Sequence, residues 1–307
     1  MTGSGRFFTL GEALAVFIPR DGASLATATA YRRTVAGSEL NVAAAVLRLG
    51  HPARFVTVVG RDGLGDAVDQ ALTGWGIDAR VGRSDRPTGT LVRELATGGP
   101  TAAVHLRAAS AATELGPDQV DAAWSPDVAA VFVTGITAVR SPSASAAVRH
   151  TVELARAAGA VVVCDPNLRP RIAGPDAFAR ALSTIRGLVD VAVGDPAELA
   201  LLSGTSPADA PAALLEQGCR LVITKFGAGG AHAVDAAGTY SAPSQATGVV
   251  DTVGAGDAFA GGVIAGLLEG ATVAEMLDLG SAVAARVVAT AGDIEGLPFR
   301  DEMGGAR

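Results

Sequence analysis

The sequence predicts an α/β fold, with a mostly parallel central sheet covered by helices on both faces and a small second β-sheet. Short apolar runs alternate with helical patterns along most of the chain, which is typical of a parallel sheet. Two segments rich in Thr or Gly interrupt this alternation. Of the 307 residues, 49% are hydrophobic and 4% aromatic, so we expect a large core built mainly from Ala, Val and Leu.

The elements follow in order. Residues 7–18 are expected to form a strand interrupted by a Gly-Glu turn, and residues 41–49 a helix that ends at Gly50. The later apolar patterns predict strands at 53–60, 128–135, 159–165, 189–194 and 220–227, and helices at 66–76, 143–158, 176–187, 196–204, 207–217 and from about 256 to 269.

Two segments do not fit the alternation. Residues 24–36 are Thr-rich and alternate in polarity, and residues 88–107 read as two strands around a Gly98-Gly99-Pro100 turn. Both favour a small antiparallel sheet that projects from the main body. Since the chain shows no repeat and no long linker, we expect a single domain over residues 1–307.

Composition and charge exclude several classes of protein. The net charge of −7 argues against a nucleic-acid or anionic-membrane surface. Cys164 and Cys219 are far apart, and neither they nor the four histidines have the spacing of a disulfide framework or a metal site. No leader pattern and no unbroken apolar stretch of about 18 residues is present, which predicts a cytoplasmic protein.

Conspicuous residues follow several predicted strands. They are Gly60-Arg61-Asp62, Asp165-Pro166-Asn167, Gly194-Asp195 and Lys225-Phe226-Gly227. Each could be an ordinary turn. Because open parallel sheets bind ligands outside the carboxyl ends of their strands, their agreement indicates a site at this edge.

Gly254-Ala255-Gly256 stands at the start of a predicted helix. Free N–H groups and the helix dipole there would hold a phosphate or a developing anion. Asp257 is unsuited to binding phosphate, but it could accept the proton of a hydroxyl that attacks phosphorus. The alternative is that this first-turn acid only stabilises the helix. No GxxxxGK[ST], GxGxxG or GxSxG motif is present, so dinucleotide oxidoreductases are disfavoured.

With these residues identified, the sequence resembles the ribokinase (PfkB) family of carbohydrate kinases. Residues 251–257 (DTVGAGD) are similar to its D-T-x-G-A-G-D motif, residues 37–43 to its sugar-site segment G-x-x-x-N-x-A, and residues 59–78 to its V-G-x-D-x-x-G stretch. The resemblance spans nearly the whole chain. It implies a ribokinase-like three-layer α/β/α sandwich with a β-sheet lid at about 24–36 and 88–107, ATP and Mg²⁺ as cofactors, and a homodimer formed through the lid.

Within that family, the sequence is most similar to 2-keto-3-deoxygluconate kinases. The segments that carry this likeness are 11–19, 86–94, 105–115, 164–172 and 292–298. The departures are Asp195 in place of the Asn of N-x-x-E, Ala36 in place of the first glycine of a Gly-Gly pair, and His105 and Leu106 in place of a tyrosine pair.

The resemblance also implies residue roles. Asp257 would be the catalytic base, and Gly254, Ala255 and Gly256 the anion hole. The remaining assignments are Gly37, Asn41, Arg107 and Arg169 for the substrate; Thr224, Lys225, Gly227, Gly230 and Thr252 for the nucleotide; and Glu198 and Asp195 for Mg²⁺ through water. A monovalent cation such as K⁺ could lie near Thr252.

Three functions remain open at this point. The first is an ATP-dependent 2-keto-3-deoxygluconate kinase, in which a planar guanidinium of Arg107 or Arg169 would bind the substrate carboxylate. The second is a fructokinase or another neutral-sugar or nucleoside kinase, for which Arg107 would matter little. The third is a non-catalytic sugar- or nucleotide-binding regulator, which would not need Asp257.

Overall fold

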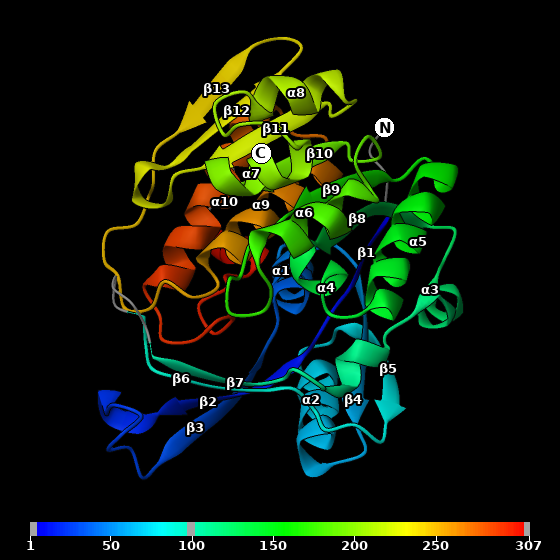
Figure 1. Cartoon of the computed structure of the whole chain (residues 1–307). Coiled ribbons are helices and arrows are strands. Elements are labelled where there is room, and N and C mark those ends of the chain that lie inside the picture. The colour runs from blue at the N-terminus through cyan, green and yellow to red at the C-terminus, as the bar shows by residue number, and fades with distance from the viewer. Residues whose placement is uncertain (1–4, 97–101, 304–307) are drawn as a thin grey trace.

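The computed structural model describes residues 5–96 and 102–303, and its centre is a nine-stranded sheet (Figure 1). The strand order is β13-β12-β11-β10-β9-β8-β1-β4-β5. Pairs from β11 through β5 are parallel, whereas β12 and β13 are added antiparallel at one edge. The strands are β1 (Arg6–Leu10), β4 (Ala53–Gly60), β5 (Asp78–Ser84), β8 (Val128–Thr134), β9 (Val161–Asp165), β10 (Val191–Gly194), β11 (Leu221–Lys225), β12 (Ala231–Asp235) and β13 (Thr239–Ala242).

Helices cover both faces of this sheet, as predicted. One face carries α1 (Ser38–Arg48), α2 (Gly63–Gly74), α9 (Ala255–Glu269) and α10 (Val273–Val288). The other carries α3 (Pro117–Ala123), α4 (Gly135–Ala138), α5 (Pro142–Ala158), α6 (Pro175–Ser183), α7 (Pro196–Ser203) and α8 (Ala210–Glu216). Successive strand residues point to opposite faces, so Phe7 belongs to one hydrophobic core and Phe8 to the other.

A second sheet projects from this body at the lower left of Figure 1. It has the order β3-β2-β6-β7, with β2 (Leu14–Pro19), β3 (Tyr31–Ala36), β6 (Thr90–Arg93) and β7 (Ala103–Leu106). We call these four strands the lid. The predicted small antiparallel sheet is present, except that β2 and β6 pair in parallel. Residues 7–18 are also not one interrupted strand: the chain leaves the main sheet at Gly11 and enters the lid as β2.

Other differences are local. In the segment 24–36 only residues 31–36 form a strand. Helix α2 begins at Gly63 rather than at 66, because the Asp62 carboxylate accepts hydrogen bonds from the N–H groups of Leu64 and Gly65 at 3.1 and 2.8 Å. The elements β5, β12, β13, α3, α4 and α10 were not predicted. The Gly98-Gly99-Pro100 turn lies outside the described residues.

Shorter features complete the description. Four 3₁₀ turns are described, at Arg20–Gly22, Ala111–Glu114, Gly227–Gly229 and Arg300–Met303. Cys164 and Cys219 are buried free thiols. Among the described residues, none of the helices has the length and apolarity needed to cross a membrane.

Candidate active site

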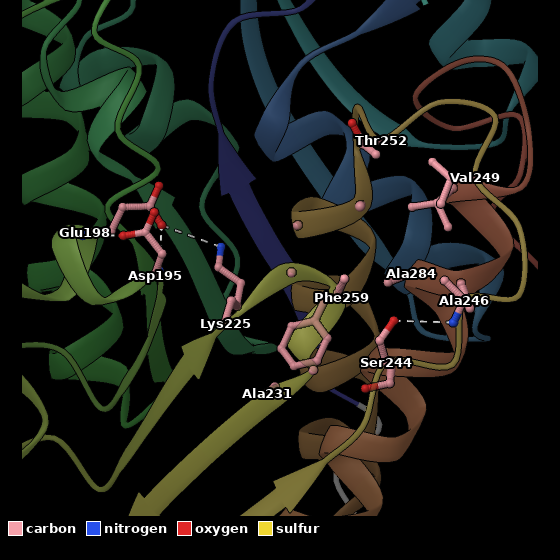
Figure 2. A pocket seen from close by; sticks show the side chains of 18 residues that line it. Asp195, Glu198, Lys225, Ala231, Ser244, Ala246, Val249, Thr252, Phe259 and Ala284 are labelled. Atoms are coloured by element: carbon pink, nitrogen blue, oxygen red, sulfur yellow. Dashed lines mark hydrogen bonds and ion pairs between the residues drawn. The ribbon is translucent and has the colours of Figure 1, made fainter. Parts of the chain in front are cut away.

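A pocket of about 560 Å³ lies where strands β10 and β11 end and helix α9 begins (Figure 2). Its polar end contains Asp195, Glu198 and Lys225, and its apolar wall includes Phe259 and Val249. Other lining residues are Gly227, Ala228, Gly230, Ala231, Ser244, Ala246, Thr252, Ala255, Gly256, Ser281, Ala284, Ala285 and Val288. The pocket therefore brings together Lys225, the Gly227–Gly230 loop, Thr252 and the start of α9. Thr224 is buried one residue before Lys225 and does not line it.

Helix α9 begins after Gly254, whose φ of 83° lies in the left-handed region. A Cβ on Gly254 would lie 2.7 Å from the carbonyl oxygen of Asp293, so the position requires glycine for two reasons. A Cβ built on Gly256 would lie 3.6 Å from Lys225 Nζ, which places that ammonium close to the first turn of α9. The N–H groups of a first helical turn and the adjacent cation form a strongly anion-attracting position.

Asp257 lies in this first turn and is 9% exposed. Its Oδ1 accepts a hydrogen bond from Ser38 Oγ at 2.6 Å, and its Oδ2 accepts one from Asn41 Nδ2 at 2.8 Å. Burial raises the pKa of the Asp257 carboxyl, although the bonds from Ser38 and Asn41 lower it. A carboxylate oriented by two donors and made more basic by burial is suited to accepting a proton.

The start of α1 is fixed from two sides. Gly37 precedes the helix, and a Cβ there would lie 2.2 Å from the carbonyl oxygen of Glu12. The buried carboxylate of Glu39 accepts hydrogen bonds from Thr134 Oγ1 and Thr137 Oγ1, each at 2.5 Å. These contacts join α1 to the ends of β1 and β8, and thereby place Ser38 and Asn41 against Asp257.

A second network connects the end of β9 to the pocket. Lys225 Nζ lies 2.6 Å from Asp165 Oδ2 and 3.9 Å from Glu198 Oε2. Burial acts to lower the pKa of Lys225, but the charges of Asp165 and Glu198 raise it overall, so the ammonium stays charged. Asn167 Nδ2 donates to Ser38 Oγ at 2.7 Å and thus reaches the Asp257 cluster.

Sequence reasoning assigned no role to Ser38, Asp165 or Asn167. Asp165 and Asn167 were noticed because they follow a strand and lie in the family-like segment 164–172, and Ser38 as part of the 37–43 segment. Asn167 adopts a positive φ of 46°, which is uncommon for a residue with a side chain, and its N–H donates to Asp165 Oδ1 at 2.9 Å. Nothing in the sequence indicates that these three side chains meet.

Asp195 and Glu198 open helix α7 as a capping box. Asp195 Oδ1 accepts from the Glu198 N–H, and Glu198 Oε2 accepts from the Asp195 N–H, both at 2.8 Å. Both carboxylates also line the pocket. The described residues contain no group of three or more His, Cys, Asp or Glu side chains able to ligate a metal directly. The two oxygen-bearing side chains instead fit a Mg²⁺ ion that keeps several of its waters.

The two predicted carboxylate-binding arginines lie in different environments. Arg107 is nearly buried, and its Nε donates to Glu12 Oε2 at 2.7 Å. The buried Glu12 also accepts a hydrogen bond from Ser110 Oγ at 2.5 Å, and its carboxylate lies 3.4 Å from Arg140 Nε. Arg169 is exposed, its Nη1 donates to the Leu168 carbonyl at 3.1 Å, and its charge lowers the pKa of Asp257.

His105, one of the departures named from the sequence, lies on lid strand β7. Its Nδ1 is buried and has no hydrogen-bond partner among the described residues. Burial, together with the charges of Arg107 and Arg171, lowers the pKa of His105, so the ring is neutral. Leu91 lies directly across from it on β6, which places both side chains on one face of the lid.

Comparison with known proteins identifies the family. The sequence matches the pfkB family of carbohydrate kinases over residues 6–300. It is 32% identical to the 2-dehydro-3-deoxygluconokinase of Bacillus subtilis (96% of this chain, 93% of the relative) and 34% identical to that of Thermoproteus tenax (87% and 83%).

A structural relative confirms the predicted ribokinase-like fold. The structure of a putative ribokinase II from Escherichia coli in complex with ATP and Mg²⁺ superimposes with a TM-score of 0.86 and 27% sequence identity, covering 97% of each chain. The motif at residues 251–257, the three-layer fold and the family match over nearly the whole chain lead to one conclusion. The chain belongs to the pfkB family of carbohydrate kinases.

Proposed function

We propose that the protein transfers the γ-phosphoryl group of ATP to the 6-hydroxyl of 2-keto-3-deoxygluconate, which is the same compound as 2-dehydro-3-deoxygluconate. The observation that carries the proposal is the Asp257 carboxylate, oriented by Ser38 and Asn41 in the first turn of α9 beside Lys225. The names of the Bacillus and Thermoproteus relatives support the sugar acid as substrate.

In the reaction, Asp257 accepts the proton of the substrate hydroxyl as its oxygen bonds to the γ-phosphorus and the bond to the β-phosphate oxygen breaks. The backbone N–H groups of residues 254–256 and the charge of Lys225 stabilise the charge that develops on the transferred group. Asp195 and Glu198 would hold Mg²⁺ through water, and the ion would neutralise charge on the phosphates. The water-mediated arrangement matches the donor set of the capping box.

The nucleotide occupies the 560 Å³ pocket. Its phosphates lie toward Lys225 and the Gly227–Gly230 loop, and its base lies against the apolar wall formed by Phe259, Val249 and the alanines shown in Figure 2. The ATP and Mg²⁺ complex of the Escherichia coli relative supports this choice of cofactors. Thr252 contacts the same pocket from the loop that precedes α9.

The substrate lies between the lid and Asp257, where Gly37 and Asn41 meet its hydroxyls. Arg169 binds its carboxylate, because the guanidinium is exposed and close enough to influence Asp257 electrostatically. Arg107 supports the site from the lid side. A neutral-sugar kinase is the second candidate, favoured by one observation: the charge of Arg107 is already matched by Glu12.

The proposal is tested by ADP release with Mg·ATP over a panel of acceptors. The panel contains 2-keto-3-deoxygluconate, 2-keto-3-deoxygalactonate, fructose, ribose, adenosine and a no-sugar control. We expect kcat/KM for the keto acids to exceed that for fructose by about 10- to 100-fold, because a charge-assisted hydrogen bond between Arg169 and the substrate carboxylate contributes roughly 1.5–3 kcal/mol. A preference for a neutral sugar would support the second candidate, and binding without turnover would support a regulator.

We further propose a homodimer formed through the lid. Val104 and Leu106 on β7 are 48% and 60% exposed, and both point away from the His105 face. The register places Val104 beside Val92 and Val92 beside Phe17, so an apolar row crosses the outer face of the sheet. Strand β7 is also an unpaired edge in the lid sheet.

The dimer is tested by the double variant Val104→Glu/Leu106→Glu. We expect light scattering after gel filtration to give twice the chain mass of 30.5 kDa for the wild type and a single chain mass for the variant. Phe299→Ser serves as the control, since Phe299 is 54% exposed but lies against Arg48 of helix α1 and is not part of a lid strand. A monomeric wild type would contradict the proposal.

A further inference from the structure

A buried ion cluster connects the lid to the loop that opens helix α9. Arg93 is the last residue of lid strand β6, and its side chain is only 2% exposed. Its Nη2 lies 2.5 Å from Asp293 Oδ1 and 2.9 Å from Asp251 Oδ2, and both acids are buried. One guanidinium therefore bridges two carboxylates that belong to separate loops of the main body.

Both acids contact the residues that lead into helix α9, at 252–256, which we call the anion-binding loop. Asp251 Oδ1 accepts from the N–H groups of Val253 and Ala96 at 3.2 and 3.1 Å, which connects the loop to the end of β6. Asp293 contributes the carbonyl oxygen that lies against Gly254, 2.7 Å from where a Cβ would stand. The two acids held by Arg93 are thus in direct contact with the residues that shape the start of α9.

This cluster requires a positive charge. Two buried carboxylates without a cation would repel each other and lose their hydration. Burial raises the pKa of Asp293, although the charge of Arg93 lowers it. Burial likewise acts to lower the pKa of Arg93, but Asp293 and Asp251 raise it overall, so the guanidinium remains ionised.

The family resemblance allows a monovalent cation near Thr252. The ion cluster lies next to that position and affects whether such a cation can bind there. The carboxylate next to Thr252 in the chain is that of Asp251, the anionic group such an ion would contact. That carboxylate is already paired with Arg93 and hydrogen-bonded by backbone N–H groups on both oxygens. The donor set is therefore satisfied by the chain itself and does not fit an added cation.

We propose that Arg93 is a built-in cation that replaces a monovalent metal ion at this loop, so that the kinase works without K⁺. Arg93 is a positioning residue: it holds Asp251 and Asp293, and through them Gly254 and the anion hole, while its backbone belongs to the lid. The proposal rests on the proposed phosphoryl transfer, and its test therefore includes nucleotide binding, which does not depend on identifying the sugar.

The first experiment uses the wild-type enzyme. Steady-state rates and the affinity for a non-hydrolysable ATP analogue, measured by calorimetry with Mg²⁺, are compared in choline chloride and in KCl at equal ionic strength. We expect both quantities to agree within two-fold. A stimulation of five-fold or more by K⁺ would overturn the proposal. If no sugar is phosphorylated, the sugar-kinase proposal fails, but the binding comparison still decides this one.

The second experiment removes the guanidinium. We expect Arg93→Ala to lose at least ten-fold in kcat in choline chloride, and K⁺ or guanidinium ion to restore part of kcat and of analogue affinity, which a purely structural role would not produce. Arg93→Lys, which keeps the charge, should retain more activity than Arg93→Ala. Arg32→Ala removes another lid-to-loop ion pair, with Glu295, and should show no cation dependence.

The outcomes separate cleanly. An Arg93→Ala protein that is folded and fully active in choline chloride would overturn the proposal, as would a folded, impaired protein that neither cation improves. If Arg93→Ala does not fold, the comparison of K⁺ with choline on the wild type decides. Arg93→Lys supplements it. For that variant we expect K⁺ to raise the unfolding temperature only if the smaller ammonium leaves the two carboxylates incompletely paired.

Discussion

Replacing Asp257 by Asn is expected to lower kcat by about 10²–10⁴-fold, the usual contribution of a general base, while the fold remains intact. The amide has the same shape and can keep a hydrogen bond to Ser38 or Asn41, but it cannot take the proton of the attacking hydroxyl. Because burial raises the pKa of the Asp257 carboxyl, the folded protein pays for ionising this group, and a neutral isostere should not lower the unfolding temperature.

The measurement is kcat at saturating substrates together with a thermal unfolding curve. The control is Asp66→Asn, since Asp66 is also a first-turn acid, on α2, but is exposed and paired with Arg83. If Asp257 only stabilised its helix, the two variants would behave alike. Full activity of Asp257→Asn would refute its assignment as the base.

The pH profile of the wild type checks the same assignment. Only the ionised carboxylate can accept a proton, so activity is lost as pH falls through the pKa of Asp257. Because that pKa is raised from the ordinary 3.8, the acidic limb of kcat/KM should lie above the range of an exposed aspartate. Asn41→Ala removes a donor that lowers this pKa, and should move the limb to higher pH.

The second large effect is expected at Arg169. Arg169→Ala should raise KM for 2-keto-3-deoxygluconate by about 10- to 100-fold, since a charge-assisted bond to a carboxylate contributes roughly 1.5–3 kcal/mol. The unfolding temperature should hardly change, because Arg169 is exposed. The assay is steady-state kinetics with the keto acid and with fructose in parallel, where only the keto acid should be affected.

Arg107→Ala is the matched comparison. It removes a guanidinium from the buried Glu12, leaving Arg140 and Ser110 as partners, so we expect a loss of stability as well as of activity. Both substrates should suffer to a similar degree if Arg107 acts through Glu12. A selective loss with the keto acid in Arg107→Ala, and none in Arg169→Ala, would reverse the two roles.

Most strands of the main sheet could be predicted from the sequence, because they are short apolar runs whose side chains are buried on both faces of the sheet. Strand β4 is found at the predicted residues 53–60, and β8 and β11 within one to two residues of their expected ends. Strands β12 and β13 lack such an apolar run and were not predicted. The half-exposed strand β5 lacks one as well. The parallel pairing of β2 with β6 was also inaccessible, since it joins segments about 75 residues apart.

The sequence by itself determined the family, the α/β architecture and the position of Asp257 at a glycine-rich helix start, because these depend on local periodicity and on a contiguous motif. Only the tertiary structure brought Ser38 to Asp257 and Asn167 to Ser38, matched Arg107 with Glu12 and placed Arg93 between Asp251 and Asp293. The reason is physical: a side chain's charge partner is set by which strand ends and loops meet at one edge of the sheet, and those meetings join residues more than 90 positions apart that no local pattern encodes.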